Sequence, residues 1–493
     1  MGYGIDCQQI IFGRENDIMN NTSNLKNFFK GSVVLIFSNL CLKAINCLLL
    51  PLYTNNLTPQ MLGVSDTITS FTGLLFPMLV MGLDSAYSAF YFEKDDKKRE
   101  DKVFSTLRAA FTVLGVIPMI ACFFSKTLSE MLFRNSDYQW VLVIALLSVT
   151  LNVWYLPFAL EIRMQNRMTI YSIITIISSL LMMCLNIYFV SIVKIGVYAL
   201  ILSTMIVYVV QLILFWLCAK RRFIFGCMDK VLLKEMLCFS LPLIPSVVTM
   251  WILNLSDRYV ILYCWGEAEV GLYGIANRVA VLLNMVISGV SMAYTTFAYA
   301  NVDNAEAKKQ YALVFNIMYI ALIGISFILS MFSREIIQLM AADTYARAYE
   351  PLQDMVFSQV IYGLFTIMNY GIYFKKKSKY TVWATTAGAG VNLVLNLMFI
   401  PKYGIMAAAT TTLIGYLVMF AIVYKYSQKL YPCKYGIKRI AMNMVSLYVI
   451  LRLTFEMRFL YKIFITLICA GITIYMFRDK VKEIFLCLRR DKR

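Results

Sequence analysis

The stretch SLPLIPSVVTMWILNLSDRYVILYCWGEAEVGLYGIANR, residues 240–278, decides how the rest of the chain is interpreted. It begins as a hydrophobic helix with two prolines near its start and then places Asn254, Asp257 and Arg258 where lipid hydrocarbon is expected. A charge near the middle of a bilayer costs at least ~2.5–3.5 kcal/mol, so it usually faces a protein interior or a watery cavity. We therefore predict that this stretch forms the wall of a polar cavity inside a membrane protein.

The composition excludes several classes of protein. With 60% hydrophobic residues, 15% charged residues and a mean hydropathy of +0.69, the chain is not a soluble globule. It has no histidine, which removes histidine-based catalysis and imidazole metal sites, and its 12 cysteines form no CxxC pair. A phosphate-cradling GxxxxGKS or GxxxxGKT loop is also absent. We therefore predict a transporter rather than an enzyme, with no cofactor and no bound metal.

Fourteen apolar segments are each long enough to cross a bilayer as a helix, which requires ~20 residues. Short connections separate them and leave no room for a soluble catalytic domain. The fold class predicted from this pattern is an all-α polytopic membrane protein. The predicted spans are 31–52, 67–91, 105–125, 138–160, 169–190, 195–218, 236–263, 271–299, 312–332, 352–374, 380–400, 404–424, 440–457 and 459–477.

The distribution of positive charge predicts the orientation. The two tails and the even-numbered junctions between spans hold 33 lysines and arginines, whereas the seven opposite junctions hold 7. Because cytoplasmic loops carry the excess of basic residues, both termini are predicted to be cytoplasmic. The net charge of +18 is therefore a topology signal, and no nucleic-acid partner is predicted.

The two halves of the chain repeat. The segment 57–63 occupies the place that 265–271 occupies 208 residues later, and Lys194-Ile-Gly196 maps onto Lys402-Tyr-Gly404 at the same offset. Six spans plus six spans that start from one side form a parallel repeat, with a shared cavity between two bundles. The predicted parts are a tail at 1–24, a first six-helix bundle at 25–220, a linker at 221–235, a second six-helix bundle at 236–430, two additional spans within 431–477 and a basic tail at 478–493.

Polar side chains recur at helical spacing in these spans. In span 1, Asn39, Lys43 and Asn46 share one helix face, and in span 8 Asn277 and Asn284 lie seven residues apart. Because spans 1, 7 and 8 begin or join the two repeats, we predict that these side chains line the cavity and bind substrate. Interhelical hydrogen bonding is the alternative role for the asparagines.

Span 7 contributes Asn254 and Arg258, and Arg278 follows in the first turns of span 8. Cations inside a membrane are costly and need an anionic partner, so Lys43, Arg258 and Arg278 favour a site for an anionic substrate. The structural alternative pairs Arg258 with an acidic residue such as Asp84.

Three acidic residues could take up a proton or an ion during transport. They are Asp84 in span 2, Asp257 next to Arg258, and Glu161 at the cytoplasmic end of span 4. A fixed structural salt bridge is the alternative role for each of them.

Several short motifs together resemble one family. They are Leu50-Pro-Leu-Tyr-Thr54, Leu57-Thr-Pro59 with Gly63, Met81-Gly-Leu-Asp84, Ser240-Leu-Pro-Leu-Ile-Pro245, Ser256-Asp-Arg-Tyr259 and the segment from Asn392 to Gly404. This combination, within residues 25–430, resembles the Wzx-type flippases, the polysaccharide-transport branch of the multidrug/oligosaccharidyl-lipid/polysaccharide exporter superfamily. The resemblance implies a V-shaped pair of bundles around a basic central cavity.

The resemblance also implies an activity. Such proteins move undecaprenyl-pyrophosphate-linked oligosaccharides from the cytoplasmic to the outer leaflet of the bacterial inner membrane, for cell-surface polysaccharide synthesis. The implied partners are the lipid-linked oligosaccharide, membrane lipids, and a polysaccharide polymerase with other assembly proteins. Two alternatives stay open, namely a drug or other small-molecule exporter of the same superfamily and a membrane enzyme of polysaccharide assembly such as a polymerase.

Overall fold

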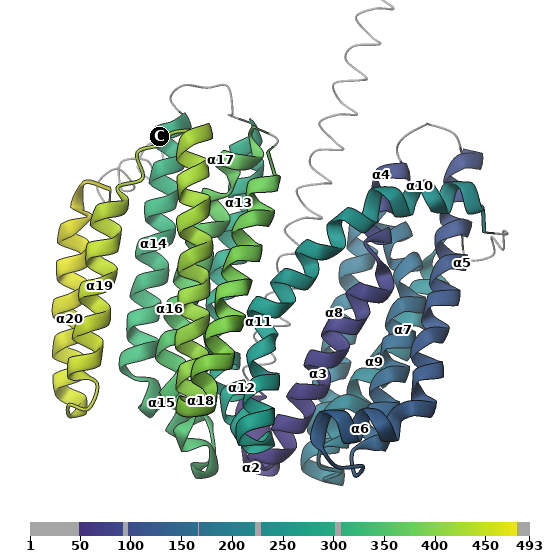
Figure 1. The fold of residues 1–493 in the computed structure, drawn as a ribbon, viewed down its shortest axis with the longest axis horizontal. Helices are drawn as coiled ribbons and strands as arrows, with labels where there is room; N and C mark the ends of the chain where they lie inside the picture. The colour runs from purple at the N-terminus through teal and green to yellow at the C-terminus, as the bar shows by residue number, and fades with distance from the viewer. Residues whose placement is uncertain are drawn as a thin grey trace, which may run out of the picture.

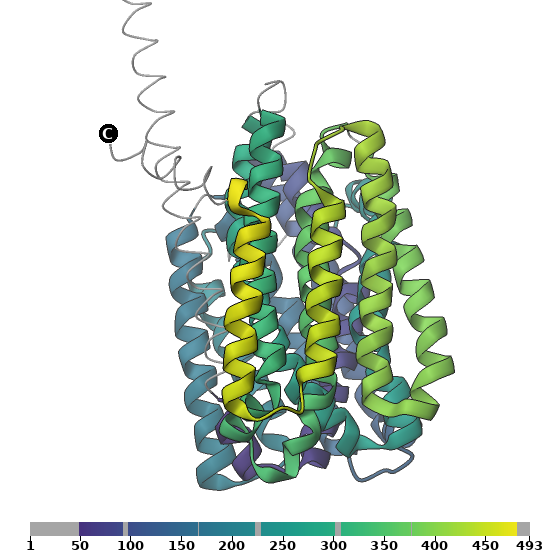
Figure 2. The ribbon, with the colours of Figure 1, turned by 90° about the vertical axis from the view of Figure 1, so that its left-hand side faces the viewer.

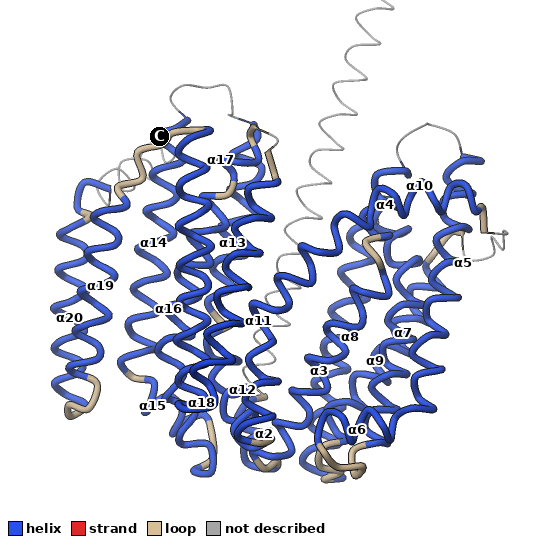
Figure 3. Tube along the Cα trace, in the orientation of Figure 1, coloured by secondary structure: helices blue, strands red, loops and turns tan. Residues whose placement is uncertain are grey.

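The computed structural model describes residues 49–91, 97–165, 167–221, 228–300, 307–375 and 377–480. Every regular element within these ranges is a helix (Figure 3). The predicted all-α fold class is therefore confirmed. The first predicted span, 31–52, lies almost entirely outside the described residues, and so do Asn39, Lys43 and Asn46.

The first half of the chain supplies the helices from α2 to α9. Thr58 caps α3 by accepting a hydrogen bond at 3.3 Å from the Met61 backbone N–H, and proline at the first helical position suits this start. The left-handed Met81 and Gly82 then separate α3 from α4. The elements are α2 (Leu50–Asn56), α3 (Pro59–Val80), α4 (Leu83–Tyr91), α5 (Lys97–Ala121), the 3-10 turn η1 (Cys122–Phe124), α6 (Ser125–Phe133), α7 (Gln139–Met164), α8 (Met168–Ile187), the π-helical turn η2 (Tyr188–Val193) and α9 (Tyr198–Cys218).

The second half begins with α10, which lies across the ends of α4 and α5 (Figure 1). Asp229 caps α10, and the salt bridge from Lys102 at 2.5 Å, with the capping N–H groups, keeps the pKa of Asp229 below its usual value. The elements are α10 (Lys230–Ser240), the 3-10 turn η3 (Leu241–Leu243), α11 (Ile244–Trp265), α12 (Glu267–Ala280), α13 (Leu283–Ala300), α14 (Ala307–Met331), α15 (Ser333–Met340), the 3-10 turn η4 (Asp343–Ala348), α16 (Tyr349–Met368), α17 (Tyr370–Tyr373), α18 (Lys379–Leu430), α19 (Ile437–Thr454) and α20 (Phe459–Met476).

The helices form two groups, α3–α9 and α11–α18, that lie next to each other with their long axes roughly aligned (Figure 1). Among the described residues, nine helices are long and apolar enough to cross a membrane, and α12 with the first half of α13 (to Ser291) meets the same criterion as a pair bent by 43°. The predicted spans after the first fall mainly on helical residues. The total of fourteen spans and the exact domain boundaries stay predictions.

The predicted parallel repeat appears in the backbone. Gly196, between η2 and α9, and Gly404, inside α18, are 208 residues apart, and each has a φ of 62°. Only glycine adopts this left-handed conformation at no steric cost, so the two halves turn at equivalent positions. In the second half the turn falls within α18, which consists of two helices joined at a kink at Gly404, and these two helices correspond to the predicted spans 380–400 and 404–424.

The two groups meet where α3 crosses α12, at a second pair of equivalent glycines. A Cβ on Gly63 would lie 1.7 Å from the carbonyl oxygen of Glu267, and a Cβ on Gly271 would lie 2.0 Å from that of Pro59. Gly63 and Gly271 are 208 residues apart, and so are Pro59 and Glu267, so the contact is reciprocal. Glycine at both positions lets the backbones touch, which closes the space between the two groups at this end.

Helices α19 and α20 stand side by side at the outer edge of the second group (Figure 2). Buried Asp354 on α16 holds α19 through Arg452 at 2.5 Å and the Tyr448 hydroxyl at 2.7 Å. Lys462 on α20 reaches Glu335 on α15 at 2.7 Å. These ion pairs attach the two additional helices to the bundle, and none of their residues lines the cavity between the two groups.

We predict that Gly63→Ala disrupts the crossing of α3 and α12. The added methyl has no space beside the Glu267 carbonyl, so the backbones must separate, and such overpacking costs ~1–3 kcal/mol of stability. A cysteine in place of Ser65 on α3 should then react faster with a membrane-impermeant thiol reagent than it does without the Gly63→Ala change.

The matched control is Gly289→Ala on α13, where nothing lies within 4 Å of the added Cβ. This variant should leave the labelling rate and the thermal stability unchanged. An unchanged labelling rate for Gly63→Ala would show that the crossing does not control access.

Candidate functional site

A cavity of about 460 Å³ lies between the two helix groups. Both halves of the chain contribute to its walls, as the predicted central cavity requires. Its lining residues are Tyr53, Ser65, Asp66, Thr69, Met182, Asn186, Leu200, Ile201, Thr204, Tyr208, Arg258, Gly274, Asn277, Arg278, Val281 and Leu282. The two arginines singled out from the sequence, 20 residues apart on α11 and α12, therefore line one cavity.

Arg278 is held by a carboxylate from the opposite group. Its Nη2 donates to Oδ1 of Asp66 on α3 at 2.6 Å, and its guanidinium carbon lies 5.6 Å from the centre of the Tyr53 ring. Gly274 makes room for the carboxylate, since a Cβ there would lie 1.8 Å from Oδ2 of Asp66. The other amino group, Nη1 of Arg278, is buried and has no hydrogen-bond partner among the described residues.

Arg258 is more deeply buried and more weakly held. It is 8% exposed, and its Nη1 donates to the Ser70 hydroxyl at 2.8 Å. Its Nε has no hydrogen-bond partner, and its guanidinium forms no ion pair with any described residue. The suggested structural pairing of Arg258 with Asp84 is wrong for this structure, because the partner of Arg258 is the neutral Ser70.

The predicted asparagines are divided between the cavity and other places. Asn277 lines the cavity. Asn254 is not among the lining residues: its amide donates within α11 to the Met250 carbonyl at 2.6 Å, and its oxygen accepts from the Tyr416 hydroxyl of α18 at 2.5 Å, which is the interhelical alternative. Asn284 lies on α13, beyond the bend that follows α12, and is not among the lining residues.

A second compartment of about 210 Å³ adjoins the first within the N-terminal group. The two compartments share Thr69, Ile201, Thr204 and Tyr208. The second one adds Thr72, Ser148 and Asn152 among its polar lining residues, and it has no charged lining residue. Hydroxyl and amide groups without charge suit the hydrogen-bonding pattern of sugar hydroxyls.

Asp257 lies outside the cavity, in the interior of the C-terminal group, where it is 2% exposed. Its Oδ2 accepts from the Tyr273 hydroxyl and, at 3.5 Å, from the Thr412 hydroxyl, while Oδ1 accepts from the Arg258 backbone N–H at 2.9 Å. Asp257 forms no ion pair with a described residue. A buried carboxylate held only by hydroxyl and amide donors can accept a proton or a small cation.

The other two acidic candidates have local surroundings. Asp84 lies in the first turn of α4, beside the helix break, where its carbonyl accepts from the Ser88 hydroxyl at 3.1 Å. Glu161 accepts from the Arg221 backbone N–H at 2.9 Å and from the Gln165 side chain at 2.7 Å.

Arg221 joins the helix ends around Glu161. Burial alone would lower the pKa of Arg221, but its hydrogen bonds to Asp101, Tyr91 and Glu100 raise the pKa above its ordinary value. Arg221 therefore stays charged and ties the ends of α4, α5 and α7 to the end of α9. Glu161 thus belongs to a structural ionic cluster, away from the cavity.

Residues 56–350 match the family model described as polysaccharide biosynthesis protein. This match covers more than half of the chain. The chain belongs to the polysaccharide biosynthesis protein family. A relative from the Lsg locus of Haemophilus influenzae is 25% identical over 295 residues, which cover 58% of this chain and 68% of that protein.

Solved structures establish the fold of this family member. The lipid II flippase MurJ in its inward closed conformation matches with a TM-score of 0.71 at 16% identity, over 92% of this chain and 100% of MurJ. A multidrug resistance MATE family transporter of the MOP superfamily matches in its inward-facing conformation with a TM-score of 0.65 at 15% identity, over 83% of this chain and 95% of the transporter. The resemblance inferred from the sequence motifs is thereby confirmed.

Sequence reasoning missed the acidic partner in the cavity of this polysaccharide biosynthesis protein. Span 2 was predicted to begin at residue 67, but α3 begins at Pro59, so Asp66 lies inside the helix instead of in the preceding connection. The N-cap residue Thr58 followed by proline was the signal for the earlier start. Asp66 and Ser70 are one turn apart on α3 and meet Arg278 and Arg258 respectively.

We predict that Asp66 and Arg278 are energetically coupled. Breaking a buried ion pair by removing one partner costs ~3–5 kcal/mol, because the other charge is left unpaired. Asp66→Asn and Arg278→Gln should each lower the thermal stability in detergent. The double variant should lose less than the sum of the single losses, with a coupling of at least ~1 kcal/mol.

The exposed pair Arg439 and Asp479, with 3.9 Å between its nearest atoms, is the control. Its coupling should be below ~0.5 kcal/mol, as for surface ion pairs in general. Additive losses at Asp66 and Arg278 would contradict the coupling.

Proposed function

We propose that this protein is a flippase that moves an undecaprenyl-pyrophosphate-linked oligosaccharide from the cytoplasmic to the outer leaflet by alternating access. The observation that carries the proposal is the placement of Arg258 and Arg278 in one cavity between the two helix groups, each with a buried guanidinium nitrogen that has no hydrogen-bond partner in the described part of the chain. Family membership supports a role in surface polysaccharide synthesis. The fold shared with a lipid II flippase supports a lipid-linked substrate.

The charge of the cavity suits a pyrophosphate diester, which carries about two negative charges. Arginine bonds phosphate oxygens through a planar fork of N–H donors, and such charge-assisted hydrogen bonds are about twice as strong as neutral ones. With two arginines against Asp66, the lining residues carry a net positive charge. An exporter of cationic drugs would require the opposite sign. Lys43 is predicted to add a third cation from span 1.

In this proposal the sugars of the headgroup occupy the polar compartment beside the cavity. An unpaired hydroxyl costs ~4–8 kcal/mol to move into hydrocarbon, so the headgroup crosses only where donors and acceptors line its path. Asn277 in the cavity and Asn152 in the second compartment offer side-chain amides to sugar hydroxyls. The lipid chain stays in the bilayer.

The energy for transport has two candidate sources in this mechanism. A negative cell interior favours export of an anion by ~2.3 kcal/mol per charge per 100 mV. We propose that Asp257 adds a coupled proton or small cation, because among Asp84, Asp257 and Glu161 it is the one buried beside Arg258. Uptake of a positive charge at Asp257 changes the electrostatic potential at the neighbouring Arg258 guanidinium.

The proposed setting is the bacterial inner membrane, with both termini in the cytoplasm. The crossing of Gly63 and Gly271 then closes the cavity toward the outer side. A polysaccharide polymerase and other assembly proteins are the predicted partners on the product side.

We predict that Arg258→Ala abolishes flipping while the protein still folds and inserts. A lipid-linked oligosaccharide should accumulate on the cytoplasmic leaflet, measured by its protection from an external glycan-modifying reagent in cells. Arg258→Lys should restore the activity only in part, because an ammonium group lacks the planar fork.

Lys234→Ala is the matched control, because it removes a cation from the exposed face of α10, outside the cavity. This variant should flip the substrate at the normal rate. If Arg258→Ala reaches the membrane at the normal level and flips at the normal rate, the proposed cationic mechanism fails.

Asp257→Asn keeps the shape of the side chain and one of its two accepting oxygens but removes the charge that takes up an ion. We expect slower flipping in vesicles and the loss of its response to an imposed proton or sodium gradient. Glu161→Gln is the control and should keep the response. A gradient response that persists in Asp257→Asn excludes Asp257 as the coupling site and leaves the substrate assignment intact.

A further inference from the structure

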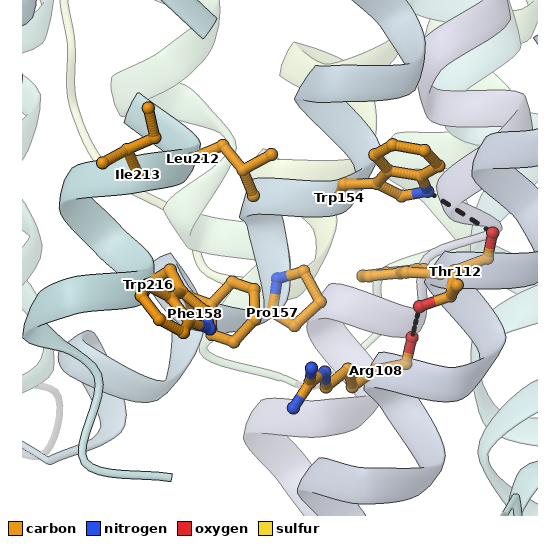
Figure 4. A pocket seen from close by; sticks show the side chains of 9 residues that line it. Arg108, Thr112, Trp154, Pro157, Phe158, Leu212, Ile213 and Trp216 are labelled. Atoms are coloured by element: carbon orange, nitrogen blue, oxygen red, sulfur yellow. Dashed lines mark hydrogen bonds between the residues drawn. The ribbon is translucent and has the colours of Figure 1, made fainter. Parts of the chain in front are cut away.

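A separate groove of about 320 Å³ lies between α5, α7 and α9 of the first helix group (Figure 4). None of its lining residues belongs to either compartment described above. Its walls combine one arginine with several aromatic rings. The lining residues are Arg108, Phe111, Thr112, Trp154, Pro157, Phe158, Leu212, Ile213 and Trp216.

The floor of the groove is fixed by close packing of α5 against α7. Gly115 on α5 lies against the Trp154 indole, since a Cβ there would be 2.3 Å from Nε1. That Nε1 donates to the Thr112 carbonyl at 3.4 Å. The guanidinium carbon of Arg108 lies 5.4 Å from the centre of the Phe158 ring, so the ring holds the charge at the groove (Figure 4).

The groove opens toward lipid. The lining residue Ile213 on α9 is 50% exposed, and Val113 on α5, which follows the lining residue Thr112, is 63% exposed. In a helix that spans a membrane, such side chains face acyl chains. An occupant of the groove therefore comes from the bilayer and brings an apolar part with it.

Basic residues lie at the end of the groove where Arg108 and Trp216 line it. Trp216 lies in the last turn of α9, which ends at Cys218, and the exposed Lys220 follows that end. The carboxylates Glu100 and Asp101 at this end are bonded to Arg221. Tryptophan and arginine at one level of a span are typical of the headgroup region of a bilayer.

We propose that this groove holds an anionic phospholipid of the predicted cytoplasmic leaflet. Its phosphate diester accepts hydrogen bonds from the Arg108 guanidinium, and one acyl chain lies along Leu212 and Ile213 against the Trp154 ring. Arginine suits a phosphate diester, and a net negative headgroup matches the basic surroundings better than a zwitterionic one. The bound lipid fills the gap between α5, α7 and α9 and keeps this side of the first group rigid.

The test measures lipid retention by the full-length protein with native mass spectrometry, using phosphatidylglycerol and phosphatidylcholine of equal chain length. We expect the wild type to retain one phosphatidylglycerol in preference to phosphatidylcholine. Arg108→Gln should weaken phosphatidylglycerol binding about tenfold, the size of one charge-assisted hydrogen bond, while Arg108→Lys should recover part of it. Arg439→Gln is the control, because Arg439 is exposed on α19, far from the groove in the chain, and does not line it.

A second variant tests the groove without removing the arginine. Ile213→Trp places a large ring in the groove from its exposed side and should displace the lipid in the same way. If Arg108→Gln does not fold, Ile213→Trp decides the outcome. Equal retention of both phospholipids by the wild type, or wild-type retention by both variants, overturns the proposal. Flipping activity is not the readout, so failure here leaves the proposed transport function untouched.

Discussion

The reciprocal contact of α3 with α12 is the constraint on which the rest of the structure depends. The two helices touch backbone to backbone because Gly63 leaves space for the Glu267 carbonyl and Gly271 leaves space for the carbonyl of Pro59. Any side chain at either glycine would push the helix groups apart and open the cavity at this end. Because the four residues are equivalent in the two halves, the contact lies on the axis that relates the repeats, where a single crossing can close the space symmetrically.

The same crossing sets the register of the residues that line the cavity. Three and seven residues beyond Gly63 come Asp66 and Ser70, and three and seven beyond Gly271 come Gly274 and Arg278. This spacing keeps each set on one helix face, so the residues that follow the crossing face one another. Asp66 fits because its repeat equivalent is a glycine, and Arg278 reaches it from the position equivalent to Ser70. Equivalent positions of the two halves carry different residues, so the charged site is asymmetric although the backbone repeat is symmetric.

The sequence predicted the helical fold, the repeat and the convergence of Arg258 and Arg278, because each depends on hydropathy, spacing or the cost of an intramembrane charge. Other details depended on geometry that spacing does not contain. Asn277 and Asn284 are seven residues apart, but the bend between α12 and α13 takes the second one off the face of the first. Asn254 accepts a hydrogen bond from Tyr416 on a neighbouring helix and does not line the cavity. Asp66 was missed because a span predicted from hydropathy begins at the first long apolar run, which starts after the polar first turns of α3.

The two arginines are held with unequal strength, and in the proposed mechanism this difference would set the order in which they bind the substrate. A phosphate that reaches Arg258 competes with the neutral Ser70 hydroxyl, whereas one that reaches Arg278 competes with the Asp66 carboxylate, which is a stronger acceptor. Arg258 is therefore the easier first contact. Recruitment of Arg278 weakens its bond to Asp66, which is a bond between the two helix groups one turn from the Gly63 crossing. In the proposed mechanism, a substrate that takes both guanidinium groups would remove an attraction that holds the closed end together, so binding and opening would be linked through Asp66.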